Sequence, residues 1–130
     1  MRAVARILIV EDSPDNMKLF SAVLGLSGHE VTGLPDGNGL VPRVEAWRPG
    51  LILMDIQLPG CDGYTLLEEL RECGYVDIPV IALTAHAMAG DEERAMEAGF
   101  DGYITKPIDV RTFPDAIAKV LLGKAGTEIA

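Results

Sequence analysis

Cysteine, positive charge and long hydrophobic runs are all scarce in this chain of 130 residues. Its 2 cysteines, Cys61 and Cys73, do not form a C-x-x-C pair, so the sequence indicates neither a zinc site nor a disulfide framework. Lysine and arginine together number 11, against 20 aspartates and glutamates, which gives a net charge of −9. Nucleic-acid binding needs a basic stripe, so we expect no direct binding of DNA.

No apolar run approaches the roughly 18 residues that cross a bilayer. The first run, Ile7–Val10, stops at Glu11 and is shorter than the apolar stretch of a signal peptide, about 7–15 residues. We therefore expect a cytoplasmic protein without a membrane partner. The length fits one domain at roughly 150 residues per domain. We expect this domain over residues 6–122, with short flexible ends at 1–5 and 123–130.

Short apolar runs alternate with stretches of helical spacing along the chain. The runs are Ile7–Val10, Val31–Leu34, Leu51–Met54, Ile78–Leu83 and Tyr103–Ile104. Strands that alternate with helices predict βαβ units and a parallel sheet. The first, third and fourth runs are almost continuously apolar, as in central strands covered on both faces, whereas the second is mixed and the fifth is short. The sequence therefore predicts the order 2-1-3-4-5 of a flavodoxin-like, doubly wound α/β fold.

Local signals mark some helix ends. Ser13 followed by Pro14 is typical of an N-cap and a first helical residue. Gly99 is typical of a helix end, and Thr112–Asp115 fits a capping box at the start of the last helix. The side chains of four methionines are predicted to fill the core: Met17, Met54, Met88 and Met96.

Polar side chains follow four of the predicted strands at the carboxyl end. Glu11 and Asp12 follow the first strand, Asp55 the third, Thr84 the fourth and Lys106 the fifth. Ligand sites in open parallel sheets form at this edge. Carboxylates about 5 Å apart repel by about 3 kcal/mol per pair at an effective dielectric near 20, so the cluster needs a cation. Mg²⁺ suits such oxygen ligands, and the sequence predicts a metal-assisted phosphoryl site with a compensating lysine.

Four segments carry a family resemblance. They are ILIVEDSPDN (7–16), LILMDIQLPGCDG (51–63), IALTAHAM (81–88) and AGFDGYITKPI (98–108). In the order and spacing of these motifs, the chain resembles a response-regulator receiver domain of the CheY-like superfamily, from about Arg6 to Leu122. The segments TAHAM and RTFP are most similar to single-domain regulators of the DivK type, and also to receivers attached to hybrid histidine kinases.

The resemblance implies a metal-assisted phosphoacceptor site. By this resemblance Asp55 is the phosphoacceptor and also a ligand of Mg²⁺. Asp12 binds the ion directly, Glu11 binds it through a water molecule, and the backbone carbonyl of Gln57 is a further ligand. A carboxylate is a competent nucleophile for phosphoryl transfer, so the chemistry is sensible apart from the family.

Other positions acquire roles from the resemblance alone. Thr84 is expected to hydrogen-bond the phosphoryl group and Lys106 to pair with it. Tyr103 matches the aromatic switch residue of the family. Gln57 and His86, two residues after the acceptor and two after the threonine, are expected to tune the lifetime of the aspartyl phosphate. The peptide before Pro107 matches the cis peptide of the family.

The implied partners are proteins. A histidine kinase or a histidine phosphotransfer protein donates the phosphoryl group, and a downstream protein binds the face made by the fourth helix, the strand around Tyr103 and the last helix. We expect an interaction as the output, because the chain has no room for an output domain. The only reactions expected are its own phosphoryl transfer and autodephosphorylation, so it is not an ordinary enzyme.

Three other functions remain open at this stage. A flavodoxin needs a donor-rich loop after the first strand, whereas Glu11 and Asp12 repel a flavin phosphate, and neither Trp47 nor Tyr64 is evidently placed to sandwich the ring. A phosphatase of the haloacid-dehalogenase type needs a second aspartate where this chain has Gln57. The third is a receiver cut from a hybrid kinase. The short ends of the chain favour a free-standing protein over this alternative.

Overall fold

A parallel sheet of five strands forms the centre of the computed structural model, which describes residues 4–58, 60–85 and 89–126. Its strands are β1 (Arg6–Val10), β2 (Glu30–Leu34), β3 (Leu51–Asp55), β6 (Val80–Thr84) and β7 (Gly102–Thr105). They lie in the order β2-β1-β3-β6-β7. Numbered one to five along the chain, they confirm the predicted order 2-1-3-4-5. A small antiparallel ribbon of β4 (Gln57–Leu58) and β5 (Cys61–Asp62) was not predicted.

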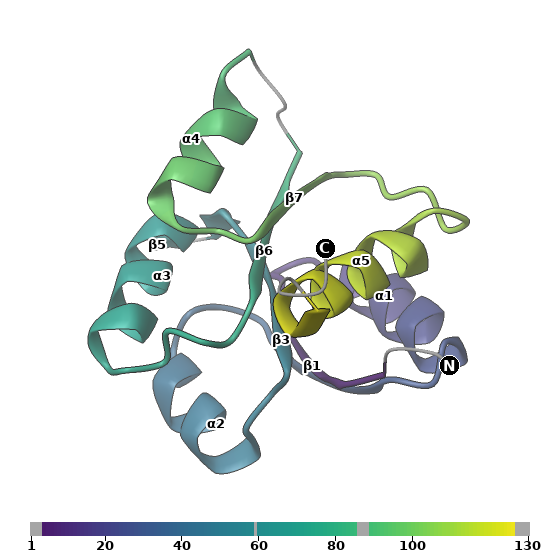
Figure 1. The fold of residues 1–130 in the computed structure, drawn as a ribbon, viewed down its shortest axis with the longest axis horizontal. Helices are drawn as coiled ribbons and strands as arrows, with labels where there is room; N and C mark the ends of the chain where they lie inside the picture. The colour runs from purple at the N-terminus through teal and green to yellow at the C-terminus, as the bar shows by residue number, and fades with distance from the viewer. Residues whose placement is uncertain (1–3, 59, 86–88, 127–130) are drawn as a thin grey trace.

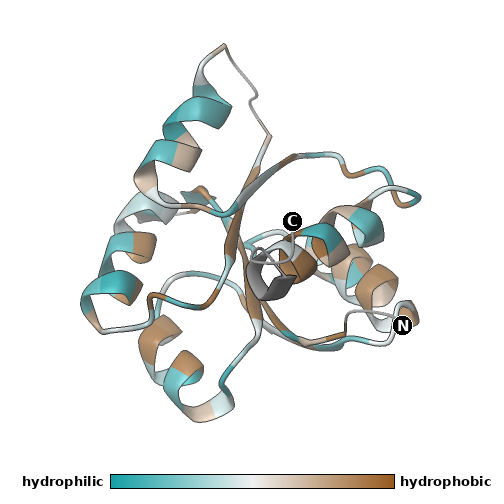
Figure 2. Ribbon diagram, in the orientation of Figure 1, coloured by the Kyte–Doolittle hydropathy of each residue, from teal (hydrophilic) through white to brown (hydrophobic). Residues whose placement is uncertain are grey.

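Helices cover both faces of this sheet. They are α1 (Pro14–Leu26), α2 (Leu40–Trp47), α3 (Gly63–Glu72), α4 (Asp91–Ala98) and α5 (Phe113–Gly126). Figure 1 shows α1 and α5 on one face and α2, α3 and α4 on the other. Alternate residues of β1 enter two separate cores: Leu8 and Val10 pack toward α2 and α3, and Ile7 and Ile9 pack toward α1 and α5. The central strands are accordingly largely brown, the hydrophobic colour, in Figure 2.

Two of the predicted helix signals, Ser13–Pro14 and Gly99, agree with the structure. Ser13 is the N-cap of α1, its side chain accepting a hydrogen bond from the backbone N–H of Asn16, and Pro14 follows it in the first turn. Gly99 ends α4 in the left-handed region, with φ of 110°, a conformation that costs glycine little. The last helix, α5, continues to Gly126, past residue 122, where the sequence predicts the end of the domain.

One prediction about the core was wrong. Met54 is fully buried and Met17 packs against the core beneath α1, as predicted, but the side chain of Met96 is 45% exposed. In α4 the neighbouring Ala95 takes the inward position, and one residue along a helix turns the side chain by about 100°. Met88 lies outside the described residues.

The single tryptophan lies at the amino-terminal end of the sheet. Trp47 ends α2, and the guanidinium carbon of Arg6 lies 4.5 Å from the centre of its ring. Arg6 is the first residue of β1, so this contact marks the end of the sheet where that strand begins. Within the described residues, no helix has the length and apolar character needed to cross a bilayer.

Candidate functional site

Three carboxylates meet at the carboxyl edge of the sheet. Glu11, Asp12 and Asp55 each offer one oxygen, and these atoms all lie within 4.8 Å of one another. The register explains the meeting: Val10 of β1 pairs with Met54 of β3, so the residues that follow them project from neighbouring strand ends. Glu11 and Asp55 are buried and Asp12 is exposed, which leaves the cluster open to solvent on one side.

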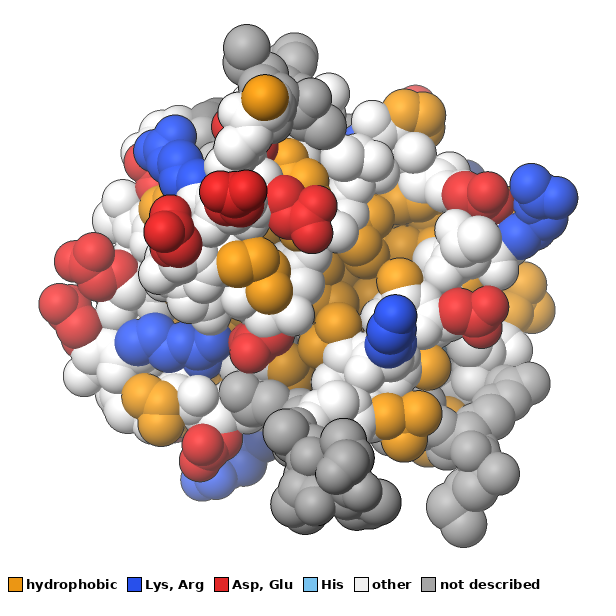
Figure 3. All heavy atoms as spheres, turned by 45° about the horizontal axis from the view of Figure 1, so that its top comes forward, with side chains coloured by type: hydrophobic (Ala, Val, Ile, Leu, Met, Phe, Trp, Pro, Cys, Tyr) orange, Lys and Arg blue, Asp and Glu red, His pale blue; other side chains and the backbone are white. Residues whose placement is uncertain are grey.

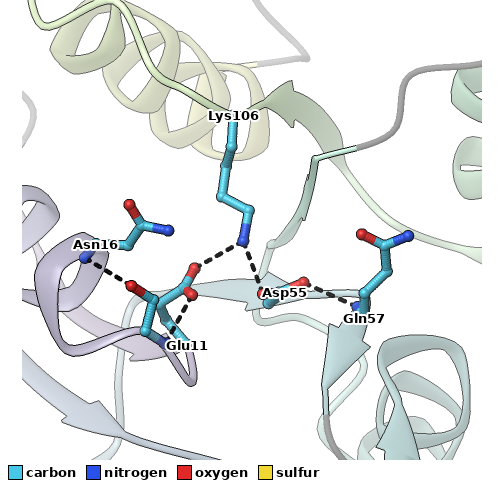
Figure 4. A network of polar contacts seen from close by, with 6 residues as sticks. Glu11, Asn16, Asp55, Gln57 and Lys106 are labelled. Carbon is cyan, nitrogen blue, oxygen red and sulfur yellow. Dashed lines mark hydrogen bonds and ion pairs between the residues drawn. The ribbon is translucent and has the colours of Figure 1, made fainter.

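Lys106 lies between the two buried carboxylates, as Figure 4 shows. Its Nζ atom donates to Oδ2 of Asp55 at 2.8 Å and to Oε1 of Glu11 at 3.1 Å. Burial lowers the pKa of Lys106, but the hydrogen bonds and charges of Asp55 and Glu11 outweigh burial and raise the pKa above its ordinary value. The side chain is therefore an ammonium at neutral pH, and it offsets the repulsion between the two acids.

Backbone N–H groups hold the same two carboxylates from the other side. Oε2 of Glu11 accepts from the N–H of Ser13 at 3.1 Å, and Oδ1 of Asp55 accepts from the N–H of Gln57 at 2.8 Å. Each carboxylate thus has one oxygen toward the lysine and one toward a turn. This arrangement fixes the orientation of Asp55 before any ligand binds.

The donor set fits a hard divalent cation. All three groups are carboxylates, which supply the oxygen atoms that Mg²⁺ prefers, and the exposure of Asp12 leaves room for water or phosphate oxygens. Among the described residues, Lys106 is the one ammonium paired with these acids, which leaves the cluster net negative, so a cation is favoured there.

Thr84 and Tyr103 lie on the next two strands. Thr84 is the last residue of β6, is buried, and lines a hollow of about 390 Å³ together with Gln57. Its carbonyl accepts a 2.7 Å hydrogen bond from the backbone N–H of Lys106. Tyr103 lies on the edge strand β7 beside Ala82, away from the carboxylates. His86 lies outside the described residues.

The hydroxyl of Tyr103 is buried although the residue as a whole is only partly so. Among the described residues, this oxygen has no hydrogen-bond partner. Burial raises the pKa of Tyr103 above its ordinary value, and the negative charge of Asp91 adds to the increase. The residue is thus a neutral phenol whose donor is unused on the side of the sheet that faces α4.

Sequence reasoning missed one residue that shapes the acceptor turn. Gly63 begins α3, and its N–H donates to the carbonyl of Ile56. A Cβ atom at this position would lie 2.8 Å from the Cα of Ile56 and 3.1 Å from the carbonyl oxygen of Asp55. Only glycine fits there without moving the turn that follows the acceptor candidate. The pair Asp62–Gly63 at a helix start signals a turn but not this close contact.

Comparisons with known proteins agree with the geometry. The family model described as the response regulator receiver domain matches residues 7–118. The chain is 44% identical over 120 residues to the polar-differentiation response regulator DivK of Brucella anthropi, covering 92% of this chain and 97% of that protein. It is also 37% identical over 118 residues to the sensor protein GacS of Pseudomonas syringae, covering 88% of this chain and 13% of GacS.

A solved structure gives the same result for the fold. The BeF3-activated N-terminal receiver domain of Klebsiella pneumoniae RstA superposes with a TM-score of 0.80 at 30% identity. The match covers 89% of this chain and 97% of that domain.

Proposed function

The chain belongs to the response-regulator receiver family, and we propose that it accepts a phosphoryl group on Asp55 and signals through its α4–β7–α5 face. Phosphorylation-based two-component signalling is the function of this family, and such a domain is a signalling module rather than an ordinary enzyme. The observation that carries the assignment is the position of Asp55. It is buried at a strand end, its Oδ2 atom lies 2.8 Å from the ammonium of Lys106, and the carboxylates of Glu11 and Asp12 lie beside it.

The transfer follows from the charges around Asp55. A carboxylate oxygen of Asp55 attacks the phosphorus atom of a phosphohistidine, and the P–N bond breaks as the P–O bond forms. The electron pair of the broken bond stays on the imidazole nitrogen, which takes a proton from water as the imidazole leaves. A histidine kinase or a histidine phosphotransfer protein would be the donor. Because phosphoryl transfer depends mostly on positioning and charge neutralisation, Lys106 assists by pairing with the transferred group.

The cofactor in this proposal is Mg²⁺. Asp12, Asp55 and the backbone carbonyl of Gln57 would hold it directly, and Glu11 through a water molecule. When bound, Mg²⁺ neutralises the charge on the phosphoryl oxygens and orients them. The fit of the three-carboxylate cluster supports this role.

Persistence and output belong to the same proposal. The phosphorylated domain would lose its phosphate slowly by its own hydrolysis, at a rate tuned by Gln57, which is exposed at the rim, and by His86. Thr84 and Tyr103 would carry the change to the α4–β7–α5 face, which binds a downstream protein. We place the domain in the cytoplasm, where histidine kinases have their phosphodonor domains.

The test is the intact mass of the full chain after incubation with Mg²⁺ and acetyl phosphate. The wild type should gain one phosphate, and the Asp55→Asn variant should gain none, because an amide is not a nucleophile for this transfer. Asp77→Asn, which changes an exposed loop acid, is the matched control and should behave as the wild type. Equal phosphorylation of Asp55→Asn and the wild type would refute the assignment.

A further inference from the structure

A groove crosses the face formed by α4, β7 and the start of α5. Two adjoining hollows, of about 890 and 300 Å³, share Tyr103 and Thr105 as lining residues. The larger extends along α4, and the smaller extends over the β7–α5 connection to Phe113. Figure 3 shows this region as a hollow with a hydrophobic floor and acidic side chains along one edge.

The charge along the groove has one sign. Glu92, Glu93 and Glu97 of α4 line the larger hollow and Asp109 the smaller, and none of the described lining residues is a lysine or an arginine. Asp109 has Arg111 beside it, at 3.5 Å. Within the described part of the chain, the three glutamates form no ion pair, and all are exposed.

The groove also offers apolar contacts. Met96, between these glutamates, is 45% exposed, so part of a flexible apolar side chain faces the groove. Beside it, the buried hydroxyl of Tyr103 donates to no described residue. A surface with apolar anchors inside an acidic rim matches the way in which grooves bind one face of an amphipathic helix.

We propose that this groove binds a cationic amphipathic helix of a partner protein, with apolar side chains against Met96 and Tyr103 and lysines or arginines beside the α4 glutamates. The inference rests on the proposed function, since it names the chemistry of the output partner. A second copy of this chain is a poorer occupant. Each copy carries a net charge of −9, and a symmetric contact would bring the same glutamates together.

Two synthetic helical peptides of equal length test the proposal. Both carry leucines on one face, and the other face carries lysines in one peptide and glutamates in the other. Binding to the full chain is measured by calorimetry with Mg²⁺ and beryllofluoride at low salt. The lysine peptide should bind at least about tenfold more tightly than the glutamate peptide, and its affinity should fall as salt is added. Equal affinities for the two peptides would overturn the proposal.

Matched triple variants locate the binding surface. The first triple variant removes three charges from α4 and should weaken the binding of the lysine peptide about tenfold; it combines Glu92→Gln, Glu93→Gln and Glu97→Gln. The control triple variant removes the same charge from the exposed surface of α3 and should weaken the binding of the lysine peptide less than about twofold; it combines Glu68→Gln, Glu69→Gln and Glu72→Gln. Equal weakening by both triples would mean unspecific attraction, and no weakening by the first would place the peptide elsewhere. Either result contradicts the proposal.

Two further measurements separate the outcomes. The first is the oligomeric state, measured by sedimentation. If the wild type is a dimer and Met96→Ala is a monomer, the groove binds a second copy and the inference is overturned. Intact mass reports phosphorylation of the α4 triple variant, which should equal that of the wild type. Normal phosphorylation of the wild type without binding of the lysine peptide contradicts this inference alone, whereas phosphorylation that survives Asp55→Asn contradicts the proposed function.

Discussion

The Nζ atom of Lys106 lies 2.8 Å from Oδ2 of Asp55, although 51 residues separate the two along the chain. The same atom reaches Glu11 at 3.1 Å, so one ammonium serves two buried carboxylates. The sheet makes this contact by bringing the carboxyl ends of β1, β3 and β7 to one edge. We therefore expect both the stability of the domain and its proposed chemistry to depend on Lys106.

Replacing Lys106 by methionine should destabilise the Mg²⁺-free protein by about 3 kcal/mol, because two buried acids then lack their partner. Urea unfolding in the presence of a chelator measures the loss, and Mg²⁺ should restore part of it. Arg111→Met is the control: its ion pair with Asp109 is exposed, and its removal should cost less than about 1 kcal/mol. Equal losses for the two variants would argue against a structural role for the buried pair.

Substitutions in the acidic cluster should distinguish the proposed direct ligand of the metal from the proposed ligand that binds it through water. Asp12→Ala should weaken Mg²⁺ binding strongly and Glu11→Ala less, because in the proposed site a water molecule lies between Glu11 and the ion. Calorimetric titration of each variant with Mg²⁺ measures the affinities, with Asp77→Asn as the control. The same affinity in the wild type and both alanine variants would contradict the assignment.

The route of the switch is expected to pass through Thr84. A phosphoryl group on Asp55 presents acceptor oxygens that the free carboxylate lacks, and the strand that carries Thr84 is paired with that of Tyr103. Thr84→Ala should therefore leave phosphorylation largely intact but reduce the chemical-shift response of Tyr103 and of α4 to Mg²⁺ and beryllofluoride. Thr65→Ala, an exposed threonine of α3, is the control. A full wild-type response in Thr84→Ala would show that coupling takes another path.

Tyr103 should titrate at a pH above its ordinary pKa of 10.0, because burial and then Asp91 disfavour the phenolate. The difference in ultraviolet absorbance between the wild type and Tyr103→Phe isolates this titration. The neutral phenol is favoured by folding, so its contribution to stability is full below pH 10.0 and is lost as the pH rises through the raised pKa. Asp91→Asn should lower the midpoint, and Asp77→Asn should not; no difference between these two variants would exclude Asp91 as a cause.

Gly63→Ala should slow phosphorylation, because the added carbon displaces the backbone of Ile56 and with it the turn after Asp55. Gly25→Ala is the control, since a carbon there meets nothing within 4 Å and replaces a glycine inside α1. The rate of phosphate gain from acetyl phosphate, measured by intact mass, compares the two. Unchanged rates in both variants would mean that the turn tolerates the displacement.

The sequence predicts the strands and the residues at their carboxyl ends better than it predicts the connections between the elements. Continuous apolar runs identify β1, β3 and β6 as central, and neighbouring parallel strands necessarily bring Glu11, Asp55 and Thr84 together. The ribbon β4–β5 has two residues per strand, too few to show a period. The exposure of Met96 could not be predicted, because the hydrophobic pattern of a short helix does not show which of its apolar residues faces the core. The contact of Gly63 depends on the path of another segment.

The contact between Arg6 and Trp47 has a spectroscopic consequence. It lies at the first residue of β1, and the acidic cluster begins after the last, so the five residues of that strand, roughly 16 Å, separate them. We therefore expect emission from the only tryptophan to follow unfolding and to be insensitive to the state of Asp55. It serves as an internal reference: a variant can be checked for folding in the same cuvette in which its phosphorylation is under way.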